Sequence, residues 1–450
     1  MNDSATIFAL SSGRPPAAIA VVRVSGPHAG TALQELAGRL PEPRKAALLR
    51  LRDPATGDLL DEALGLWFPA PHSETGENVA EFQLHGGPAV IAGVLRALGH
   101  VEGCRPAEAG EFSRRAFENG RLDLTGVEGL ADLIAAETSA QRKQALRQLK
   151  GLIGDRAEAW RRRLIDALAL VEAGIDFTDE ADVPQNLIEP ALHAAQLLRD
   201  EIVARLADGG CAERLRDGLV VAIAGPPNAG KSTLINRIAK RDVAIVSPYP
   251  GTTRDVIEVH LDLGGFPVTL LDTAGIRKGA DPVEREGVKR AQERASAADL
   301  VLWITDLSAG GGGDDKPMGI AGAADIWRIA NKTDLDPGPA ALKNENKFDL
   351  MISAAQGSGV DGLIAALAQY ASQFFSSIET GIVTRARHRF ALEATVTALD
   401  RALSEATGQR REEVIAEELR LAATTLGRLT GRVDVEDLLD VIFRDFCIGK

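Results

Sequence analysis

The chain has 450 residues, a hydrophobic fraction of 45% and a formal net charge of −13 at pH 7. Its length predicts about three domains, each large enough for its own core. An aromatic content of 4% disfavours recognition of nucleic acid by rows of stacked bases. The acidic balance disfavours nonspecific coating of nucleic acid, because that mode requires Lys and Arg to neutralise phosphates, but it permits a local basic face.

Cysteine usage and apolar run length indicate the compartment. Cys104, Cys211 and Cys447 are far apart and form no CxxC pair, so neither a zinc site nor a disulfide framework is indicated and a reducing compartment fits. The first residues lack the basic start and apolar run of a secretory signal, and no stretch is apolar for long enough to span a bilayer. We therefore expect a cytoplasmic protein without a membrane span.

The first 120 residues predict an α+β domain, because short apolar runs such as "AIAVVRVSG" and "EALGLWFPA" alternate with turns rich in Gly and Pro. The pattern becomes helical over 121–215. There, Leu124, Val127, Ala131 and Ile134 recur at helical spacing, and Thr125 is placed to cap the helix. The acidic segment "IDFTDEADVP" interrupts this helical block.

Residues 216–375 predict an α/β domain. The apolar run "LVVAIAG" precedes a glycine-rich loop and the helical segment "KSTLINRIAK". Two strands follow, "VIEVHLDL" and "FPVTLLD", with "GG" as the turn between them. The later runs "DLVLWITD", "DIWRIANKTD" and "FDLMISAA" suit buried strands of a mostly parallel sheet.

Residues 376–450 return to helical periodicity, as in "RFALEATVTALDRAL". Neither helical block can easily bury its apolar faces alone. The two blocks therefore predict one helical domain into which the α/β domain is inserted. The alternative is two separate helical modules.

The segment "GPPNAGKS", from Gly225 to Ser232, matches the P-loop pattern G-x-x-x-x-G-K-[ST] between a predicted strand and a predicted helix. Backbone N–H groups and the helix N-terminus would hold phosphates, Lys231 would reach the β- and γ-phosphate oxygens, and Ser232 would ligate magnesium. A chance glycine turn is the alternative for this segment alone. The predicted nucleotide contacts here are Asn228, Ala229, Gly230, Lys231, Ser232 and Thr233.

Further segments follow in the order expected of a GTPase. An Asp at the end of "NKTD" can accept hydrogen bonds from both N1–H and the exocyclic amine of guanine, whereas adenine would leave the carboxylate unpaired. Thr253 in "GTTRD" is the candidate second magnesium ligand. The other predicted nucleotide contacts are Asp272, Thr273, Ala274 and Gly275 of "DTAG", Asn331, Lys332 and Asp334 of "NKTD", and Ser353, Ala354 and Ala355 of "SAA".

The sequence lacks the glutamine that usually orients the attacking water in a GTPase. Ras-like GTPases orient it with a glutamine just after the glycine of "DTAG", and Ile276 and Arg277 stand there in this sequence. A cation held by oxygen ligands can stabilise charge in the transition state as an arginine finger does. Asn228 offers one such oxygen, and the loop "SPYPG" offers backbone carbonyls.

At these residues the sequence resembles the MnmE (TrmE) family of tRNA-modification GTPases over essentially its whole length. The segments that carry the resemblance are "GPPNAGKSTLIN", "AIVSPYPGTTRD", "DTAGIR" followed by "VEREG", "NKTD", "RRAFENGRLDL" and the terminal "FCIGK". The resemblance implies an α/β P-loop G domain inserted into a discontinuous α-helical domain and preceded by an α+β domain for folate binding and dimerisation. The implied limits are 1–120 for the N-terminal domain, 121–215 and 376–450 for the two helical halves, and 216–375 for the Ras-like G domain.

The resemblance also implies site residues that the pattern alone would not select. It implies that Glu284 of "VEREG" orients the water and that Cys447 is a reactive thiol. Their alternatives are a solvated helix-start acid and a small buried apolar side chain. The implied potassium ligands are Asn228, Ser247, Tyr249 and Thr252, of which Ser247 and Thr252 also contact GTP. The implied folate ligands are Arg23, Glu81, Arg121 and Lys450, whose charges suit a folate tail and pterin ring. Arg23 and Glu81 are otherwise ordinary ion-pair residues.

Taken together, we expect a homodimeric, potassium-activated GTPase that binds GTP, Mg²⁺, K⁺ and 5-formyl- or methylene-tetrahydrofolate. With the FAD-dependent partner protein MnmG, in a heterotetramer, it would place a (carboxymethyl)aminomethyl group on carbon five of the wobble uridine of tRNA. One alternative is a ribosome-assembly GTPase whose helical flanks bind RNA without chemistry, although no GXXG loop or basic tail follows Ser372. A second is a folate-dependent transferase with a regulatory G domain.

Overall fold

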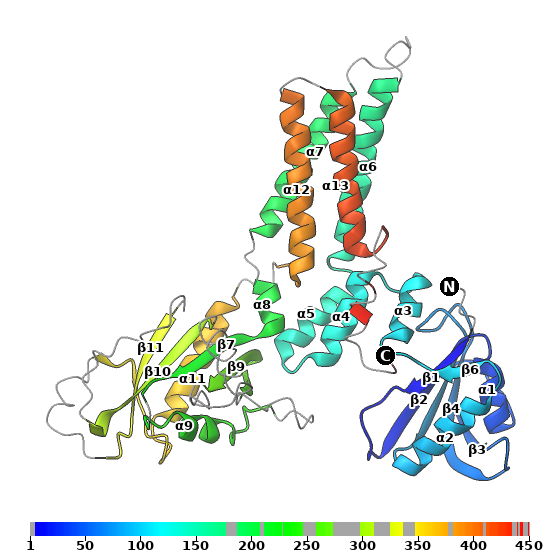
Figure 1. Cartoon of the computed structure of the whole chain (residues 1–450), viewed down its shortest axis with the longest axis horizontal. Coiled ribbons are helices and arrows are strands. Elements are labelled where there is room, and N and C mark those ends of the chain that lie inside the picture. Colours follow the sequence, from blue (N-terminus) through cyan, green and yellow to red (C-terminus); the bar gives the residue numbers. More distant parts are fainter. Residues whose placement is uncertain are drawn as a thin grey trace, which may run out of the picture. The chain divides into compact units, whose positions relative to one another are not determined.

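The computed structural model describes two compact units (Figure 1). The first contains 1–131, 148–198 and 394–450, and the second contains 132–147 and 199–393. The described residues are 5–176, 187–207, 211–226, 228–245, 258–272, 298–309, 325–335, 347–376, 381–407, 411–433, 439, 442, 443 and 449. Within these residues, the structure contains no helix with the length and apolar character needed to cross a membrane.

The first unit begins with a six-stranded sheet. Its neighbouring strands are antiparallel except for β1 and β6, which are parallel. The strand order is β3(Ala47–Arg52), β4(Leu59–Phe68), β5(Val79–His85), β2(Ile19–Ser25), β1(Thr6–Leu10) and β6(Cys104–Pro106). This mixed sheet with its helices is the α+β fold that the sequence predicts for this part of the chain.

Alternation along β2 separates a core face from a polar face. Val22 and Val24 lie in the core with side chains from α1(Ala29–Ala37) and α2(Pro88–His100). Because successive side chains of a strand point to opposite faces, Arg23 and Ser25 lie on the other side of the sheet. That side faces α3(Glu111–Glu118), whose Phe112 is buried against residues of β1.

The helix after α3 starts differently from the prediction. Thr125 was predicted to cap it, but Thr125 is fully buried within α4(Leu124–Ala135). Asp123 caps the helix instead, since its Oδ1 accepts hydrogen bonds from the Gly126 amide at 2.7 Å and from the Thr125 hydroxyl at 2.8 Å. The further helices are α5(Ser139–Leu149), α7(Ile188–Leu206), α8(Cys211–Asp217) and α12(Ala386–Thr407).

The two helical blocks of the sequence pack on each other. Helix α6(Gly154–Asp176), from the first block, lies against α13(Glu412–Thr430), from the second (Figure 1). Buried Trp160 and Leu164 of α6, and Leu419 and Leu426 of α13, form the apolar stripes that drive this packing. The alternative of two separate helical modules is therefore wrong.

The second unit contains a six-stranded, mostly parallel sheet. The strand order is β12(Leu350–Met351), β11(Asp325–Asn331), β10(Leu300–Asp306), β7(Leu219–Ala224), β9(Phe266–Asp272) and β8(Glu258–Leu263). Only the β8–β9 pair among these strands is antiparallel. Its turn is Gly264–Gly265, and both glycines have positive φ, as a two-residue hairpin loop requires. The predicted strand pair and parallel sheet are confirmed.

Two predicted buried strands need correction. β12 covers only two residues of "FDLMISAA" and lies at the sheet edge, so its Met351 is 39% exposed. The start of β11 is also exposed, while its last three residues are buried. Helices α9(Lys231–Ile238) and α11(Val360–Phe374) pack on the apolar core of this sheet. Since parallel strands end at the same edge, β7, β9, β10 and β11 present their carboxyl ends together.

Candidate functional site

The P-loop joins the carboxyl end of β7 to α9 and requires glycine at two points. Gly225 has φ +141°, and an added Cβ would collide with the carbonyl oxygen of Ile304. Gly230 has φ +97°, and its Cβ would collide with Nδ2 of Asn331. Asn228 also has positive φ, at +64°, and its side chain is exposed. The backbone thus passes close to two neighbouring strand ends, which is the arrangement of a phosphate-binding loop.

Lys231 lies along this loop with its ammonium group largely out of water. The residue is 7% exposed, and Nζ donates hydrogen bonds to the carbonyl oxygens of Gly225 and Pro226, each at 2.8 Å. Burial lowers the pKa of Lys231, and the nearby charge of Asp272 only partly opposes this. A desolvated cation at the start of a helix suits an anionic ligand.

Ser232 and Asp272, predicted from separate motifs, lie together. The Ser232 hydroxyl donates to Asp272 Oδ2 at 3.1 Å, and Asp272, at the end of β9, is 2% exposed. The Ser232 hydroxyl in the first turn of α9 and the Asp272 carboxylate at the end of β9 are hard oxygen ligands of the kind that magnesium prefers. Thr233, the next residue of the helix, is exposed.

Asn331 connects the phosphate side of the site to the base side. Its Nδ2 donates to the carbonyl oxygen of Ala229 at 2.7 Å, and its Oδ1 accepts from the amide of Ala354 at 2.9 Å. The residue is 1% exposed. The sequence placed Asn331 and Ala354 among the nucleotide contacts, and the structure shows that they also brace the P-loop against the "SAA" segment.

A hydrogen bond from Ser353 fixes the orientation of the Asp334 carboxylate. The hydroxyl of Ser353, which is fully buried, donates to Asp334 Oδ1 at 2.6 Å and accepts from the amide of Gln356 at 3.0 Å. Asp334 itself is exposed, as is Ala355. An exposed carboxylate with a fixed orientation can accept two parallel N–H groups from one edge of guanine.

Two residues that the sequence analysis did not select complete this side of the site. Asp306, at the end of β10, pairs with Lys332 at 2.5 Å; burial raises the pKa of Asp306, but hydrogen bonds from Lys332 and Ser308 bring it below its usual value. Arg237 of α9 donates through Nε to the carbonyl oxygen of Ala354 at 2.5 Å. Asp306 ends a predicted strand, which was an available signal, whereas Arg237 had none.

Several predicted residues lie outside the described part of the chain, so their calls stay predictions. They are Ser247, Tyr249, Thr252, Thr253, Thr273, Ala274, Gly275, Glu284, Cys447 and Lys450.

In the first unit, Arg23 and Glu81 form a pair across neighbouring strands. They are register partners of β2 and β5, and Arg23 Nε donates to Glu81 Oε1 at 2.9 Å. The guanidinium also pairs with Glu74 and lies 5.9 Å from the ring centre of Phe112. Both side chains remain partly exposed, at 16% and 19%, and their role as folate ligands stays a prediction.

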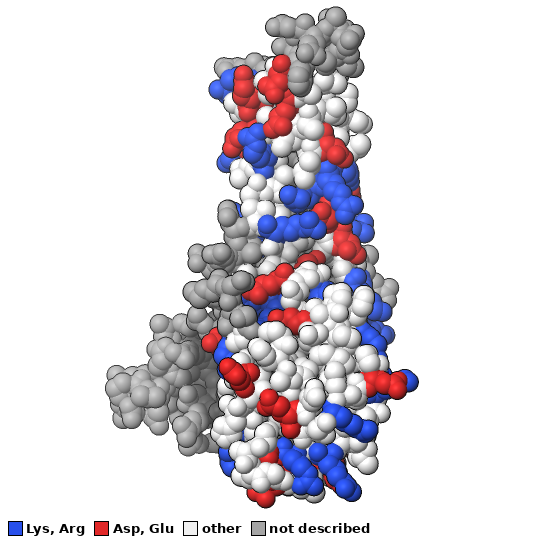
Figure 2. Space-filling model, turned by 90° about the vertical axis from the view of Figure 1, so that its right-hand side faces the viewer, with Lys and Arg blue, Asp and Glu red and all other residues white. Residues whose placement is uncertain are grey.

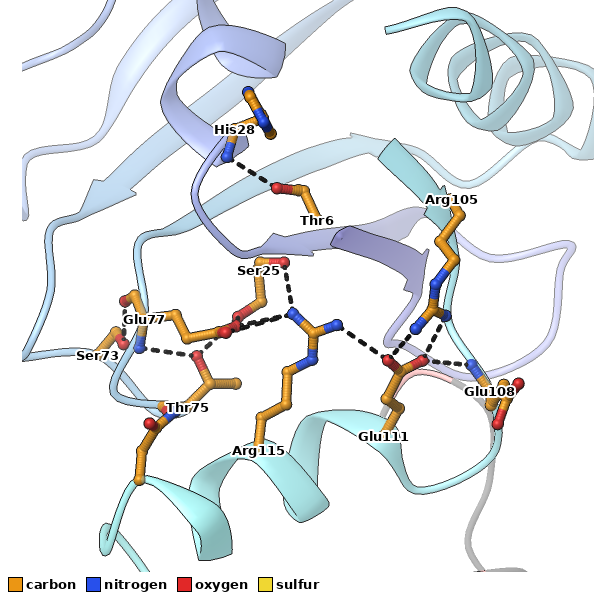
Figure 3. Close-up of polar contacts among 11 residues, drawn as sticks. Thr6, Ser25, His28, Ser73, Thr75, Glu77, Arg105, Glu108, Glu111 and Arg115 are labelled. Atoms are coloured by element: carbon orange, nitrogen blue, oxygen red, sulfur yellow. Dashed lines mark hydrogen bonds and ion pairs between the residues drawn. The ribbon is translucent and has the colours of Figure 1, made fainter. Parts of the chain in front are cut away.

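A buried polar network fixes the loop that carries Glu74 (Figure 3). Arg115 of α3 lies between two carboxylates, 3.1 Å from Glu77 Oε2 and 3.0 Å from Glu111 Oε1. Glu77 also accepts the hydroxyl of Ser25 at 2.7 Å, and Glu111 accepts two bonds from Arg105 at 2.7 and 2.9 Å. Burial raises the pKa of Glu111, but these hydrogen bonds bring it below its ordinary value. The network anchors residues 73–77 beside Arg23.

The other two predicted folate ligands are Arg121, which lies near the anchored residues 73–77, and Lys450. The side chain of Arg121 packs near Gly76 of the anchored loop, because a Cβ at Gly76 would lie 3.3 Å from Arg121 Cγ. Lys450 is not described, but Gly449, which precedes it, packs against the carbonyl group of Leu10 at the end of β1. The adjacent Ser11 has a buried hydroxyl with no hydrogen-bond partner in the described part of the chain. A polar atom of this kind suits a ligand that brings its own donor or acceptor.

A phosphate loop and an oriented Asp at the carboxyl edge of a parallel sheet define a guanine-nucleotide-binding P-loop protein. Residues 6–121 match the family model described as GTP-binding protein TrmE N-terminus, and residues 124–447 match the model described as MnmE helical domain. The chain therefore belongs to the MnmE family, as the sequence resemblance predicted, and the predicted order of domain types is confirmed.

Individual relatives agree over the full length. The chain is 58% identical over 447 residues to the tRNA modification GTPase MnmE of Bradyrhizobium sp. (strain ORS 278), with 99% of each chain covered. It is 55% identical over 447 residues to the protein of that name from Parvibaculum lavamentivorans, covering 99% of this chain and 100% of the relative. The protein of that name from Azorhizobium caulinodans is 52% identical over 450 residues, with both chains fully covered.

Proposed function

We propose that this chain is a cytoplasmic, potassium-activated GTPase that modifies carbon five of the wobble uridine of tRNA together with the FAD-containing protein MnmG. It would act as a homodimer through its N-terminal domain and take the one-carbon unit from a tetrahydrofolate derivative. The domain limits proposed are those predicted from the sequence. The observation that carries the GTPase part is the oriented Asp334 carboxylate, joined through Ser353 to the segment that Asn331 braces against the P-loop.

At the phosphates, the chain supplies positive charge and oxygen ligands. Lys231 would exchange its two backbone carbonyl partners for β- and γ-phosphate oxygens. Ser232 is proposed to hold magnesium, and its hydroxyl, which donates to Asp272 in the structure, would turn to the metal. Thr253 is the proposed second ligand, and Glu284 is proposed to orient the attacking water.

The P-loop position of Asn228 supports a potassium site. Its exposed amide stands at a positive-φ bend of the loop, and amide oxygens are suitable ligands for a hard monovalent cation. Ser247, Tyr249 and Thr252 are proposed to complete the ligand set. A potassium ion held there supplies the positive charge that an arginine finger brings to other GTPases.

In the first unit, the chain offers a folate a paired Arg and carboxylate on one sheet face. Arg23 orients Glu81, whose carboxylate would accept the N–H groups of a pterin ring. Arg121 and Lys450 are proposed to bind the carboxylates of the folate tail, and Cys447 to act as a thiol in the modification chemistry. The bound folate supplies the one-carbon unit.

Replacing potassium with sodium tests the proposed potassium site. We expect GTP turnover to fall on the order of 10²-fold when KCl is replaced by NaCl, since one transition-state contact in a dry site contributes about this much. Equal turnover in both salts would contradict the proposed site.

An Asn228→Ala variant separates cation binding from nucleotide binding. It should lose most of the potassium stimulation while its affinity for a fluorescent GDP stays close to that of the unchanged chain. A parallel loss of stimulation and affinity would assign Asn228 to nucleotide binding alone. Asn236→Ala, the same change at an exposed position of α9 outside the predicted contacts, is the matched control.

The nucleosides of bulk tRNA test the modification. Cells without the gene should lack the modified wobble uridine, and the unchanged gene should restore it. The Arg23→Ala variant should fail to restore it although its GTP turnover is normal, because Arg23 lies in the other unit. Unchanged nucleosides in the deletion strain would favour the ribosome-assembly alternative, and modification without the partner protein would favour a self-sufficient transferase.

A further inference from the structure

Charge is segregated along the antiparallel pair of helices α6 and α13. Arg432 Nε lies 3.2 Å from Glu158 Oε2, and Arg420 Nη2 lies 2.7 Å from Glu172 Oε1. These ion pairs place the start of α6 beside the end of α13. We call this part of the pair, residues 154–163 and 427–433, the arginine end.

The arginine end is basic in a chain whose net charge is −13. Its charged residues are six arginines, with no lysine, and two acids: Arg156, Arg161, Arg162, Arg163, Arg428 and Arg432, with Asp155 and Glu158. The opposite end, 164–176 and 412–426, has a single Arg, Arg420, which pairs with Glu172 and Glu417, and seven acids: Asp166, Glu172, Asp176, Glu412, Glu413, Glu417 and Glu418. Figure 2 shows Lys and Arg side chains grouped part-way along the upright helices, among which α6 and α13 are labelled in Figure 1.

Arg161 is the most informative of these arginines. Its Nε is buried and has no hydrogen-bond partner among the residues that the structure describes. It lies 3.4 Å from where a Cβ of Gly427 would be, so the guanidinium packs against α13 at Gly427. A guanidinium N–H kept from water without an acceptor is destabilising unless a ligand supplies the acceptor. Arg428, next to Gly427, is exposed and adds a second positive charge at this point.

We propose that the arginine end binds the phosphate backbone of tRNA, an inference that rests on the proposed function. Guanidinium groups match phosphate oxygens in a bidentate geometry, and a set of arginines without lysine favours such contacts over simple point charges. The described residues of the arginine end offer no apolar centre of the kind that a protein partner needs. Trp160 is buried, and the exposed large apolar side chains described in the two helices, Ile165 and Leu421, stand singly.

The salt dependence of tRNA binding tests this surface. The double variant Arg161→Gln/Arg428→Gln leaves both helix-aligning ion pairs in place. In the full chain, it should weaken binding of an unmodified tRNA transcript on the order of 10-fold at about 100 mM salt. The slope of log affinity against log salt should become less negative by about 1 to 2, because each lost phosphate contact contributes roughly 0.7 to 0.9. Fluorescence anisotropy of labelled tRNA measures both quantities.

Two controls distinguish phosphate contacts from general damage. Arg161→Lys/Arg428→Lys keeps the charges and should recover most of the slope, and Glu412→Gln/Glu413→Gln at the acidic end should not reduce it. An unchanged slope in the Gln variant, or no tRNA binding by the unchanged chain, would overturn the proposal. The proposal would also be overturned if the Gln variant bound tRNA normally but no longer bound an acidic protein partner. These outcomes are independent of the nucleoside test, which can fail while the tRNA slope behaves as expected.

Discussion

Replacing Asp334 with Asn is expected to weaken GTP binding about 10²- to 10⁴-fold, since two hydrogen bonds to a charged acceptor, each contributing about 1.5 to 3 kcal/mol, are lost. The Asn amide would donate where guanine also donates. Xanthine carries a carbonyl oxygen in place of the exocyclic amine, so Asp334→Asn should bind xanthosine triphosphate better than GTP. Titration with fluorescent guanosine and xanthosine diphosphates measures the two affinities and shows which nucleotide the variant prefers.

The geometry makes this result specific to Asp334. Ser353 holds the side chain through Oδ1, and an Asn oxygen can accept the same bond, so the orientation should persist in the variant. Asp361→Asn, an identical change at an exposed acid of α11, should leave both affinities unaltered. Loss of both nucleotides, or unchanged GTP binding, would show that Asp334 does not read the base.

Lys231→Met should separate nucleotide binding from stability. In the folded chain the pKa of Lys231 is below its unfolded value, so at neutral pH its charge opposes folding. Removing the charge should therefore leave the unfolding temperature of the nucleotide-free chain unchanged or slightly higher. GTP affinity should fall about 10²-fold or more, because charge-assisted bonds to two phosphates are lost.

Thermal unfolding with and without GTP reads both effects in one experiment. Ligand binding raises stability by RT ln(1 + c/Kd), where c is the GTP concentration, so at GTP about ten times the Kd of the unchanged chain the shift should nearly vanish in Lys231→Met. Lys240→Met, at an exposed position just after α9, should keep the full shift. A marked fall in the unfolding temperature of nucleotide-free Lys231→Met would mean that Lys231 is structural, and a retained shift would mean that it does not bind phosphate.

Local patterns in the sequence were sufficient for much of the second unit. The strand–loop–helix order, the Gly264–Gly265 turn and the P-loop depend on residues close in sequence, and their physical causes are strand alternation, positive φ and helix-terminal N–H groups. The hairpin and the parallel strands formed as predicted. The cap of α4 was misassigned because Asp123 and Thr125 are both good capping residues, and only the position of the helix start distinguishes them.

The sequence by itself determined the family and the class of nucleotide, and it predicted the residues that meet the phosphates and base, because those depend on short motifs in a set order. Only the tertiary structure decided how the motifs are tied together: Asn331 bonds to Ala229 across 102 positions, and Arg237 to Ala354 across 117. The same holds for the network around Arg115 and for the alignment that places Arg161 against Gly427. Such pairs are set by which strands and helices become neighbours, and no local pattern encodes that choice.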